Sequence, residues 1–152
     1  MKKLFALLLA AVMMLGMMSF ASAESSMKVA MVTDYGDITD QSFNQTTYEA
    51  CKLFCETAQI DFKYYKPATN SDEDRINSIE KAIEDGFNVI VMPGYAFAPA
   101  IVGTVGEYPD VKFIALDVSE YDLQDANGTA DDFSWVYPEN LYSAVYQEEL
   151  CG

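Results

Sequence analysis

Acidic, aromatic and amide side chains are concentrated in the stretch 33–44, which reads TDYGDITDQSFN. Three aspartates recur at every third position, and Phe43 and Asn44 follow them side by side. A stacking ring beside an amide that both donates and accepts suits a flat, polar, heteroaromatic ligand. Phe43 has an alternative role, because it also falls at helical spacing with later apolar residues and would then be the first core residue of a helix.

The elements around this stretch place it at the end of a strand. An apolar run, Val29-Ala30-Met31-Val32, precedes it, and a helical pattern follows. Gly36 allows a tight turn, and Asp40 is predicted to be the N-cap of the helix, with residues 41–44 as its first turn. The free N–H groups of that turn would face a ligand beyond the strand. The predicted core face of the helix is Phe43, Thr47, Ala50, Cys51, Phe54 and Ala58.

The middle of the chain alternates short apolar runs with helical patterns. Strands are predicted at residues 61–66, 88–92 and 111–116. One helix is predicted to start after Ser71 and to end at Gly86, its C′ glycine, and another to start at Pro99. This alternation is typical of βαβ units, so we expect an α/β fold with a parallel sheet and right-handed crossovers.

The last part of the chain has a different sequence pattern. Residues 121–132 are polar and predicted to be irregular, and residues 133–137 are predicted to form a fifth strand. A helix is predicted to begin near Glu139 and to present apolar residues at helical spacing, namely Leu141, Ala144 and Val145.

Candidate ligand-binding residues follow three of the predicted strands. The carboxyl ends of parallel strands share one edge of a sheet, which is where open α/β folds bind ligands. That edge would carry Asp34, Tyr95 with Phe97, and Asp117. Acids and aromatic rings brought together from separate strands indicate a binding crevice.

The start of the chain has the pattern of a signal peptide. Lys2 and Lys3 form a charged region, residues 4–18 are apolar, and Ala21-Ser22-Ala23 is a small-residue cleavage site. We therefore predict cleavage before Glu24 and export of the protein.

Charge and cysteine usage exclude several classes of function. Without residues 1–23 the chain has seven basic and 24 acidic side chains, a net charge of −17. Such a chain does not bind nucleic acid through phosphates and is repelled by anionic membranes.

Cys51 and Cys55 are predicted to be small buried hydrophobes, and no cysteine at the cleavage site offers a lipid anchor. The sequence has no histidine and no Cys-x-x-Cys pair, so no metal site and no cofactor are predicted.

Four runs of the sequence resemble, in the same order, the basic membrane protein family, which comprises nucleoside-binding substrate-binding proteins of ABC importers. The most specific feature is the aspartate-glycine loop that leads into Ser42-Phe43-Asn44. The alternation of strands and helices alone would equally fit sugar-binding relatives of the same fold. The four runs are KVAMVTDYGDITDQSFNQTTYEACK, AIEDGFNVIVMPGYAFAPAI, YPDVKFIALD and ENLYSAVYQEELCG.

The resemblance implies a three-layer, Rossmann-like parallel sheet that forms the first lobe of a type I periplasmic binding protein. We then expect a signal peptide at residues 1–23, an N-terminal α/β lobe at 24–137, and a hinge with the start of a second, truncated lobe at 138–152. Members of that family continue through a second lobe, so the chain is expected to be an N-terminal fragment that holds half of the ligand site.

The resemblance also implies roles for the site residues. The ring matching Phe43 stacks on a purine, the side chains matching Asn44 and Asp117 hydrogen-bond the edge of the base, and the aspartate matching Asp34 lies in the same cleft. The implied ligand is a purine nucleoside such as guanosine, inosine or adenosine, and the implied partner is an ABC transporter permease. Membrane association would occur only through that transporter, in the periplasm or on the outer face of the cell membrane.

The sequence leaves two alternative functions open and argues against a third. A sugar receptor of the same fold could use Asp34, Asp37, Tyr95 and Phe97, since sugar sites combine carboxylates with stacking rings. A ligand-sensing domain of an exported signalling protein is a second alternative. An enzyme is not expected, because the sequence has no histidine, no Gly-x-Ser-x-Gly elbow and no Walker glycine loop.

Overall fold

The computed structural model describes residues 27–146. The predicted signal peptide, residues 1–23, and the last part of the predicted hinge segment, residues 147–152, lie outside the described residues. In chain order the elements are β1 (Lys28–Val32), α2 (Phe43–Ala58), β2 (Asp61–Tyr65), α3 (Asp72–Glu84), β3 (Val89–Pro93), the 3₁₀ helix η2 (Tyr95–Phe97), α4 (Ala98–Thr104), β4 (Lys112–Leu116), α5 (Glu120–Ala126) and β5 (Leu141–Ala144).

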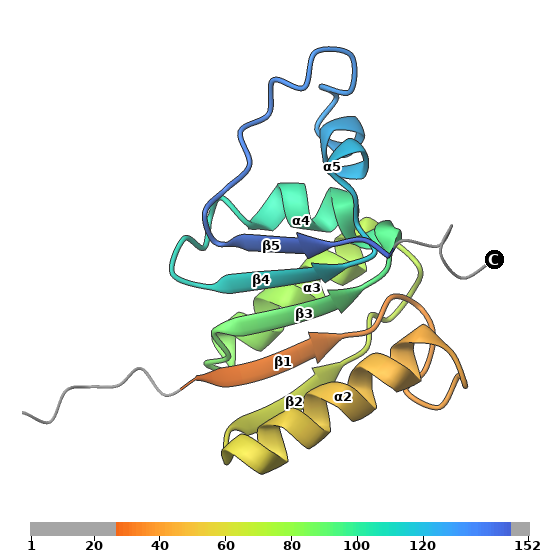
Figure 1. The fold of residues 1–152 in the computed structure, drawn as a ribbon, viewed down its shortest axis with the longest axis vertical. Helices are drawn as coiled ribbons and strands as arrows, with labels where there is room; N and C mark the ends of the chain where they lie inside the picture. Colours follow the sequence, from red (N-terminus) through yellow and green to blue (C-terminus); the bar gives the residue numbers. More distant parts are fainter. Residues whose placement is uncertain (1–26, 147–152) are drawn as a thin grey trace, which may run out of the picture.

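The five strands form one parallel sheet in the order β2-β1-β3-β4-β5, and their carboxyl ends lie on the right in Figure 1. The chain moves from β1 outward to β2 and then returns to the other side of β1, so the strand order reverses between β1 and β3. Helix α2 lies on one face of the sheet, and α3 and α4 lie on the other (Figure 1). The predicted three-layer α/β architecture is therefore confirmed.

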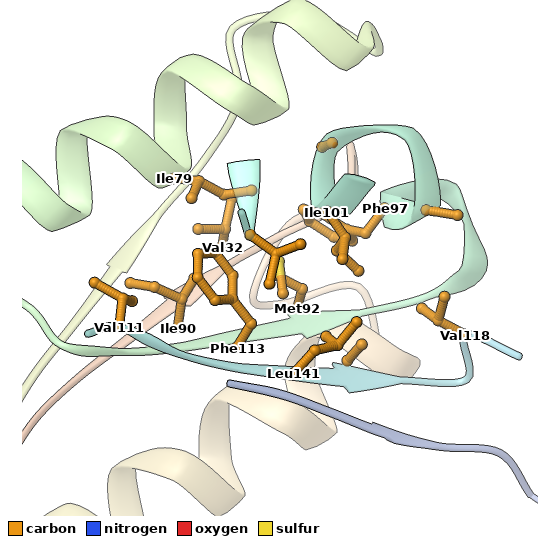
Figure 2. Packing of buried hydrophobic residues seen from close by; sticks show 14 of the residues in the cluster. Val32, Ile79, Ile90, Met92, Phe97, Ile101, Val111, Phe113, Val118 and Leu141 are labelled. Atoms are coloured by element: carbon orange, nitrogen blue, oxygen red, sulfur yellow. The ribbon is translucent and has the colours of Figure 1, made fainter. Parts of the chain in front are cut away.

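The central strands are apolar on both sides because both faces of the sheet are covered there. Along β1, Ala30 and Val32 point into the main core with α3 and α4, whereas Val29 packs on the α2 side near Cys55. Figure 2 shows the main core, in which strand and helix side chains interdigitate; its labelled members include Val32, Ile90, Met92, Phe113, Ile79 and Ile101.

Helix α3 begins and ends where its sequence predicts. Ser71 is the N-cap, and its Oγ accepts a hydrogen bond from the N–H of Asp74 at 3.1 Å. Gly86 follows the helix in the left-handed region, with φ of +90°, a conformation that favours glycine. The acidic first turn of the helix is placed against the positive end of its dipole.

The prediction of irregular structure at residues 121–132 is wrong for its first half, which forms most of α5 (Glu120–Ala126). Ser119 and Asp122 make a capping box. The Oγ of Ser119 accepts from the N–H of Asp122 at 3.1 Å, and Asp122 Oδ2 accepts from the N–H of Ser119 at 2.7 Å. This pair is the signal that was missed in the sequence.

The predicted fifth strand and final helix are also wrong. Residues 133–137 form no strand, and Leu141–Ala144 form β5 instead of the start of a helix. Asn140 holds this segment against the rest of the fold, since its Nδ2 donates to the carbonyl oxygens of Val105, Tyr108 and Val111 at 3.0–3.1 Å. Strand β5 thus belongs to the same sheet, although it lies in the segment assigned to the hinge; the rest of the lobe division stays a prediction.

Helix α2 is the only helix on its face of the sheet among residues 27–146. It contacts β2, β1 and β3, so the α2 side of β4 and β5 is left partly open. Cys55 is buried under this helix and Cys51 is half buried, and burial raises the pKa of the Cys51 thiol to about 11, with Cys55 adding to the effect. Within residues 27–146, every helix is too short or too polar to cross a membrane.

Candidate ligand-binding site

The candidate site lies at the carboxyl edge of the sheet, where the strand order reverses. The loop that contains Asp34 follows β1, Tyr95 follows β3, and Asp117 follows β4 directly. Because β3 alone separates β1 from β4 and neighbouring strands lie about 4.8 Å apart, the ends of β1 and β4 are about 10 Å apart. In open α/β sheets this reversal creates the crevice that takes a ligand.

Asp34 is fixed at this edge by hydrogen bonds to a single carboxylate oxygen. Its Oδ1 accepts from the N–H of Tyr35 at 2.5 Å, from the N–H of Gly36 at 2.7 Å and from Asn44 Nδ2 at 2.8 Å. The residue is half buried. A carboxylate held in this way is a strong hydrogen-bond acceptor of fixed direction.

Asn44 lies beneath the loop, with only 4% of its surface exposed. Its Nδ2 donates to Asp34 and also to Asp40 Oδ2 at 2.9 Å, and its Oδ1 accepts from the N–H of Asp34 at 3.2 Å. The structure therefore places Asn44 inside the loop, as a bridge between two acids. The contact of Asn44 with the edge of a base, which the resemblance implies, stays a prediction.

Gly36 allows the loop to pack over this bridge. A Cβ atom at Gly36 would lie 2.4 Å from Asn44 Nδ2 and 3.2 Å from Asp34 Oδ1. The positive φ angle that often requires a glycine in a tight turn is not the reason for this glycine, since Gly36 is not among the residues with positive φ. Close approach of the backbone to the Asn44 side chain is the reason.

The sequence predicts Asp40 as the N-cap of α2. Asp40 does cap the helix, but from a position before the N-cap residue. The helix begins at Phe43 and Ser42 occupies the N-cap position, but Asp40 Oδ1 accepts from the N–H groups of Ser42 at 2.8 Å and Gln45 at 3.1 Å. Burial alone would raise the pKa of the Asp40 carboxyl. Hydrogen bonds from Asn44 and from the backbone outweigh that effect and hold the pKa below its usual value.

The predicted core face of α2 is right for Thr47, which is buried, and wrong for Phe43, which is half exposed. The buried residues of the helix are Asn44, Thr47 and Cys55, one position away from much of the predicted apolar stripe. Phe43 is half exposed at the first position of the helix. Its aromatic ring therefore retains surface for a ligand.

Tyr95 and Phe97 have different environments. Tyr95 is 70% exposed and borders a cavity of about 390 Å³ that Arg75 and Asp122 also line. Phe97 is fully buried in the main core, with the Arg75 guanidinium 5.8 Å from its ring centroid. We correct the assignment of Phe97 from ligand-binding to core residue, because its ring has no exposed surface.

Asp117 is half buried and adopts a left-handed backbone conformation, with φ of +60°. Its N–H donates to the carbonyl oxygen of Ala144 at 2.7 Å, which extends the pairing of β4 with β5 by one residue. Residues other than glycine seldom adopt this conformation, and aspartate and asparagine tolerate it best. The backbone turn redirects the chain immediately after β4, at the edge that carries the candidate site.

Two contacts at this edge were missed from the sequence. The ring of Tyr146 meets that of Phe43 with centroids 5.8 Å apart, and Lys66 Nζ lies 2.9 Å from Asp37 Oδ2. The Lys66 ammonium lowers the pKa of the Asp37 carboxyl through a hydrogen bond and through its charge. Lys66 follows the end of β2 and Tyr146 follows the end of β5. A correct prediction of β5 and of the parallel strand order would therefore have placed both side chains at this edge.

The chemistry of this edge is that of hydrogen bonding and stacking. It offers carboxylates as acceptors, the rings of Phe43 and Tyr95, and a loop ordered by backbone N–H groups. Among residues 27–146, no cluster of three or more histidine, cysteine or acidic side chains is arranged to hold a metal ion. These groups suit recognition of a small polar molecule.

Comparison with known proteins identifies the family. A family model described as ABC transporter substrate-binding protein, PnrA-like, matches residues 27–150. The chain belongs to this Bmp family. The predicted resemblance is thus confirmed at the level of the family.

Individual relatives have low sequence identity to this chain. It is 29% identical over 94 residues to a CD4+ T-cell-stimulating antigen of Listeria monocytogenes, and the match covers 59% of this chain and 26% of that protein. The chain therefore spans about a quarter of the length of the curated relative it matches.

Solved structures support the fold. An ABC transporter solute-binding protein from Aeropyrum pernix has a TM-score of 0.64 at 18% identity, and the match covers 81% of this chain and 29% of that one. One from Conexibacter woesei has a TM-score of 0.60 at 21% identity, covering 79% and 35%. The similarity to these two structures supports the parallel α/β fold described above.

Proposed function

We propose that this chain forms one lobe of an exported substrate-binding protein that delivers a purine nucleoside to an ABC importer. The single observation that carries the proposal is the half-exposed ring of Phe43 at the first position of α2, directly before Asn44, whose amide donates to the Asp34 carboxylate at the sheet edge. Membership of the Bmp family supports the transport role. The cleaved signal peptide and the position outside the cytoplasmic membrane are parts of the same proposal.

Each of these residues would contact a different part of the ligand. The Phe43 ring stacks on the base, which contributes about 1–3 kcal/mol and is tolerant of base identity. Asp117 accepts from an N–H group at the edge of the base, and hydrogen bonds to a charged group contribute about 1.5–3 kcal/mol. Tyr95 forms the outer wall of the site. The second lobe closes over the opposite face of the ligand, and the protein returns the ligand unchanged.

Calorimetric titration of the full-length protein with nucleosides and monosaccharides tests the proposal. We expect guanosine, inosine and adenosine to bind, and Phe43→Ala to weaken all three by about tenfold or more. Phe54→Ala is the matched control, because Phe54 is an exposed phenylalanine further along the same helix. Binding of a monosaccharide with no response to nucleosides would support the sugar receptor instead, and turnover of a nucleoside would support an enzyme.

A further inference from the structure

An apolar cavity of about 570 Å³ lies on the α2 side of the sheet, where the helices of residues 27–146 leave β4 and β5 partly open (Figure 1). Its floor consists of side chains on three neighbouring strands, since Val91 pairs with Ile114 and Ile114 pairs with Tyr142. Ala50 and Phe54 of α2 belong to its wall. Cavities of this size commonly hold small-molecule ligands.

This cavity is separate from the candidate nucleoside site. Phe54 follows Phe43 by eleven residues in α2, which corresponds to about 16 Å along the helix. Lys112, which also lines the cavity, is the first residue of β4, whereas Asp117 follows the last one, about 16 Å further along the strand. The cavity therefore lies toward the amino edge of the sheet.

Lys112 is the one charged residue in the lining of this cavity, and its side chain is exposed. Residues 27–146 contain seven basic side chains, and six of them form ion pairs with acidic side chains of the same segment. Lys112 is the seventh, and it forms no ion pair with any described residue. An unpaired ammonium group thus lies at the rim of an apolar cavity, in a chain with 24 acidic residues.

An anionic amphiphile matches both features. A hydrocarbon chain gains free energy when it leaves water for an apolar cavity, and an anionic head group could pair with Lys112 while it stays solvated at the rim. The cavity wall carries no opposing charge at neutral pH. Burial is the main effect that raises the pKa of the Cys51 thiol to about 11, so this wall residue stays protonated.

A second copy of the chain does not match them. Two copies related by a two-fold axis bring the same surface of each molecule together. The lining contains no acidic side chain, so Lys112 of one copy would gain no ion partner there from the other copy. Each copy would also bring a large negative net charge, which opposes association.

We propose that this cavity is a second ligand site, which binds a long-chain fatty acid with its hydrocarbon chain along the strand floor and its carboxylate next to Lys112 Nζ. The inference goes beyond the proposed function and uses none of the residues assigned to the nucleoside. Binding is noncovalent.

Calorimetric titration with decanoate and with 1-decanol tests the contact with the head group. We expect Lys112→Met to weaken decanoate binding by about two- to fivefold at low salt, since exposed ion pairs are weak, and to leave 1-decanol binding unchanged. Lys52→Met is the matched control, because Lys52 is a half-exposed lysine of α2 outside the lining. A wild type that binds neither ligand, or equal losses for both in Lys112→Met, would overturn the proposal.

Octanoate, decanoate and dodecanoate test the contact with the hydrocarbon chain. Each added CH₂ group should raise affinity by about two- to fourfold while it enters the cavity. Ala50→Trp should weaken decanoate and 1-decanol alike by about tenfold or more, because an indole ring at this position would occupy the cavity. Ala58→Trp is its control, at an exposed alanine that ends the same helix outside the lining. Affinity that is independent of chain length, or wild-type affinity in Ala50→Trp, would contradict this site.

Sedimentation velocity distinguishes a fatty acid from a second copy, and we expect monomers that bind one decanoate each. A dimer that Ala50→Trp dissociates and decanoate does not would assign the surface to a second copy and overturn the proposal. Inosine titrations keep the two proposed sites apart. Phe43→Ala should leave decanoate affinity unchanged, and Ala50→Trp should leave inosine affinity unchanged. A protein that binds decanoate but no nucleoside would refute the proposed function alone.

Discussion

Phe43 and Tyr146 meet edge to face, with ring centroids 5.8 Å apart and ring planes at 71°. Phe43 is the first residue of α2, whereas Tyr146 follows β5, at the opposite end of the sheet from β2. The contact joins the start of α2 to the end of the last strand. It also restrains the ring on which we propose that the base stacks.

The first prediction concerns the energy of this ring contact. Edge-to-face pairs contribute about 0.5–1.5 kcal/mol beyond their buried area, and the lower value is expected because Tyr146 is 56% exposed. Urea unfolding of Phe43→Leu, Tyr146→Leu and the double variant should give a coupling free energy of about 0.5 kcal/mol. Tyr121→Leu is the control, since Tyr121 contacts Phe133 instead. Additive losses for Phe43 and Tyr146 would contradict the prediction.

A second prediction concerns pH and Asp85, which lies between two lysines. Its carboxylate accepts from Lys63 Nζ, Lys81 Nζ and the Tyr65 hydroxyl, each at 2.8 Å. The hydrogen bond from Lys63 is the largest of the effects that hold the pKa of Asp85 well below its usual range, followed by those from Lys81 and Tyr65. A lowered pKa in the folded state stabilises the fold above the unfolded pKa of about 3.9, and this stabilisation is lost as the pH falls below that value.

Asp85→Asn should therefore lower the urea midpoint at pH 7, and the difference from wild type should shrink steadily below about pH 4. In a Lys63→Met/Lys81→Met background the same substitution should have a much smaller pH-dependent effect, because the main donors are gone. An equal destabilisation by Asp85→Asn at pH 7 and at pH 3 would argue against this electrostatic explanation.

Local sequence signals were sufficient for most of the fold and failed where distant contacts decide the structure. Ser71 marks the start of α3 and Gly86 marks its end, both through interactions of neighbouring residues, so the sequence predicts both helix ends. Leu141 and Ala144 also have helical spacing, yet they pair with β4 because Asn140 anchors the segment to three carbonyl oxygens far away in the chain. Short apolar runs do not distinguish a helix from a strand.

The candidate site shows the same limit at the level of side chains. The strand order predicts that Asp34 and Asp117 share an edge, and the sequence supplies both acids. Which groups are already bound within the protein is a property of the folded loop. Asn44 has the residue type of a base-reading amide, but its donors are directed to Asp34 and Asp40. The burial of Phe97 likewise follows from the packing of η2 against the core.

A third prediction concerns the open side of the sheet next to α2. Phe54 is 56% exposed there and borders an apolar cavity of about 570 Å³ together with Val91, Ile114 and Tyr142. Contiguous exposed apolar surface binds hydrophobic dyes and promotes association. We expect the chain of 152 residues to enhance the fluorescence of such a dye in its folded state and Phe54→Asp to reduce that signal. Val136→Asp, which changes an exposed valine in the segment before β5, should leave the signal unchanged.

The last prediction concerns the choice among purines and uses the backbone of Asp117. Its φ of +60° makes Asp117→Asn a clean substitution, because asparagine tolerates the left-handed region and has nearly the same shape, whereas alanine would add backbone strain. The change replaces an acceptor-only carboxylate with one acceptor and one donor.

In the full-length protein an ionised Asp117 favours bases that present an N–H group, so guanosine and inosine should bind at least as tightly as adenosine. Asp117→Asn should change this ranking, with losses of about tenfold or more for guanosine and inosine, since each would lose a hydrogen bond to a charged group. Phe43→Ala should instead weaken all three nucleosides together, because every base has a face that stacks. Calorimetry of both variants with the three nucleosides separates these patterns. An Asp117→Asn variant that keeps the wild-type ranking would place the determinant of base choice on another residue.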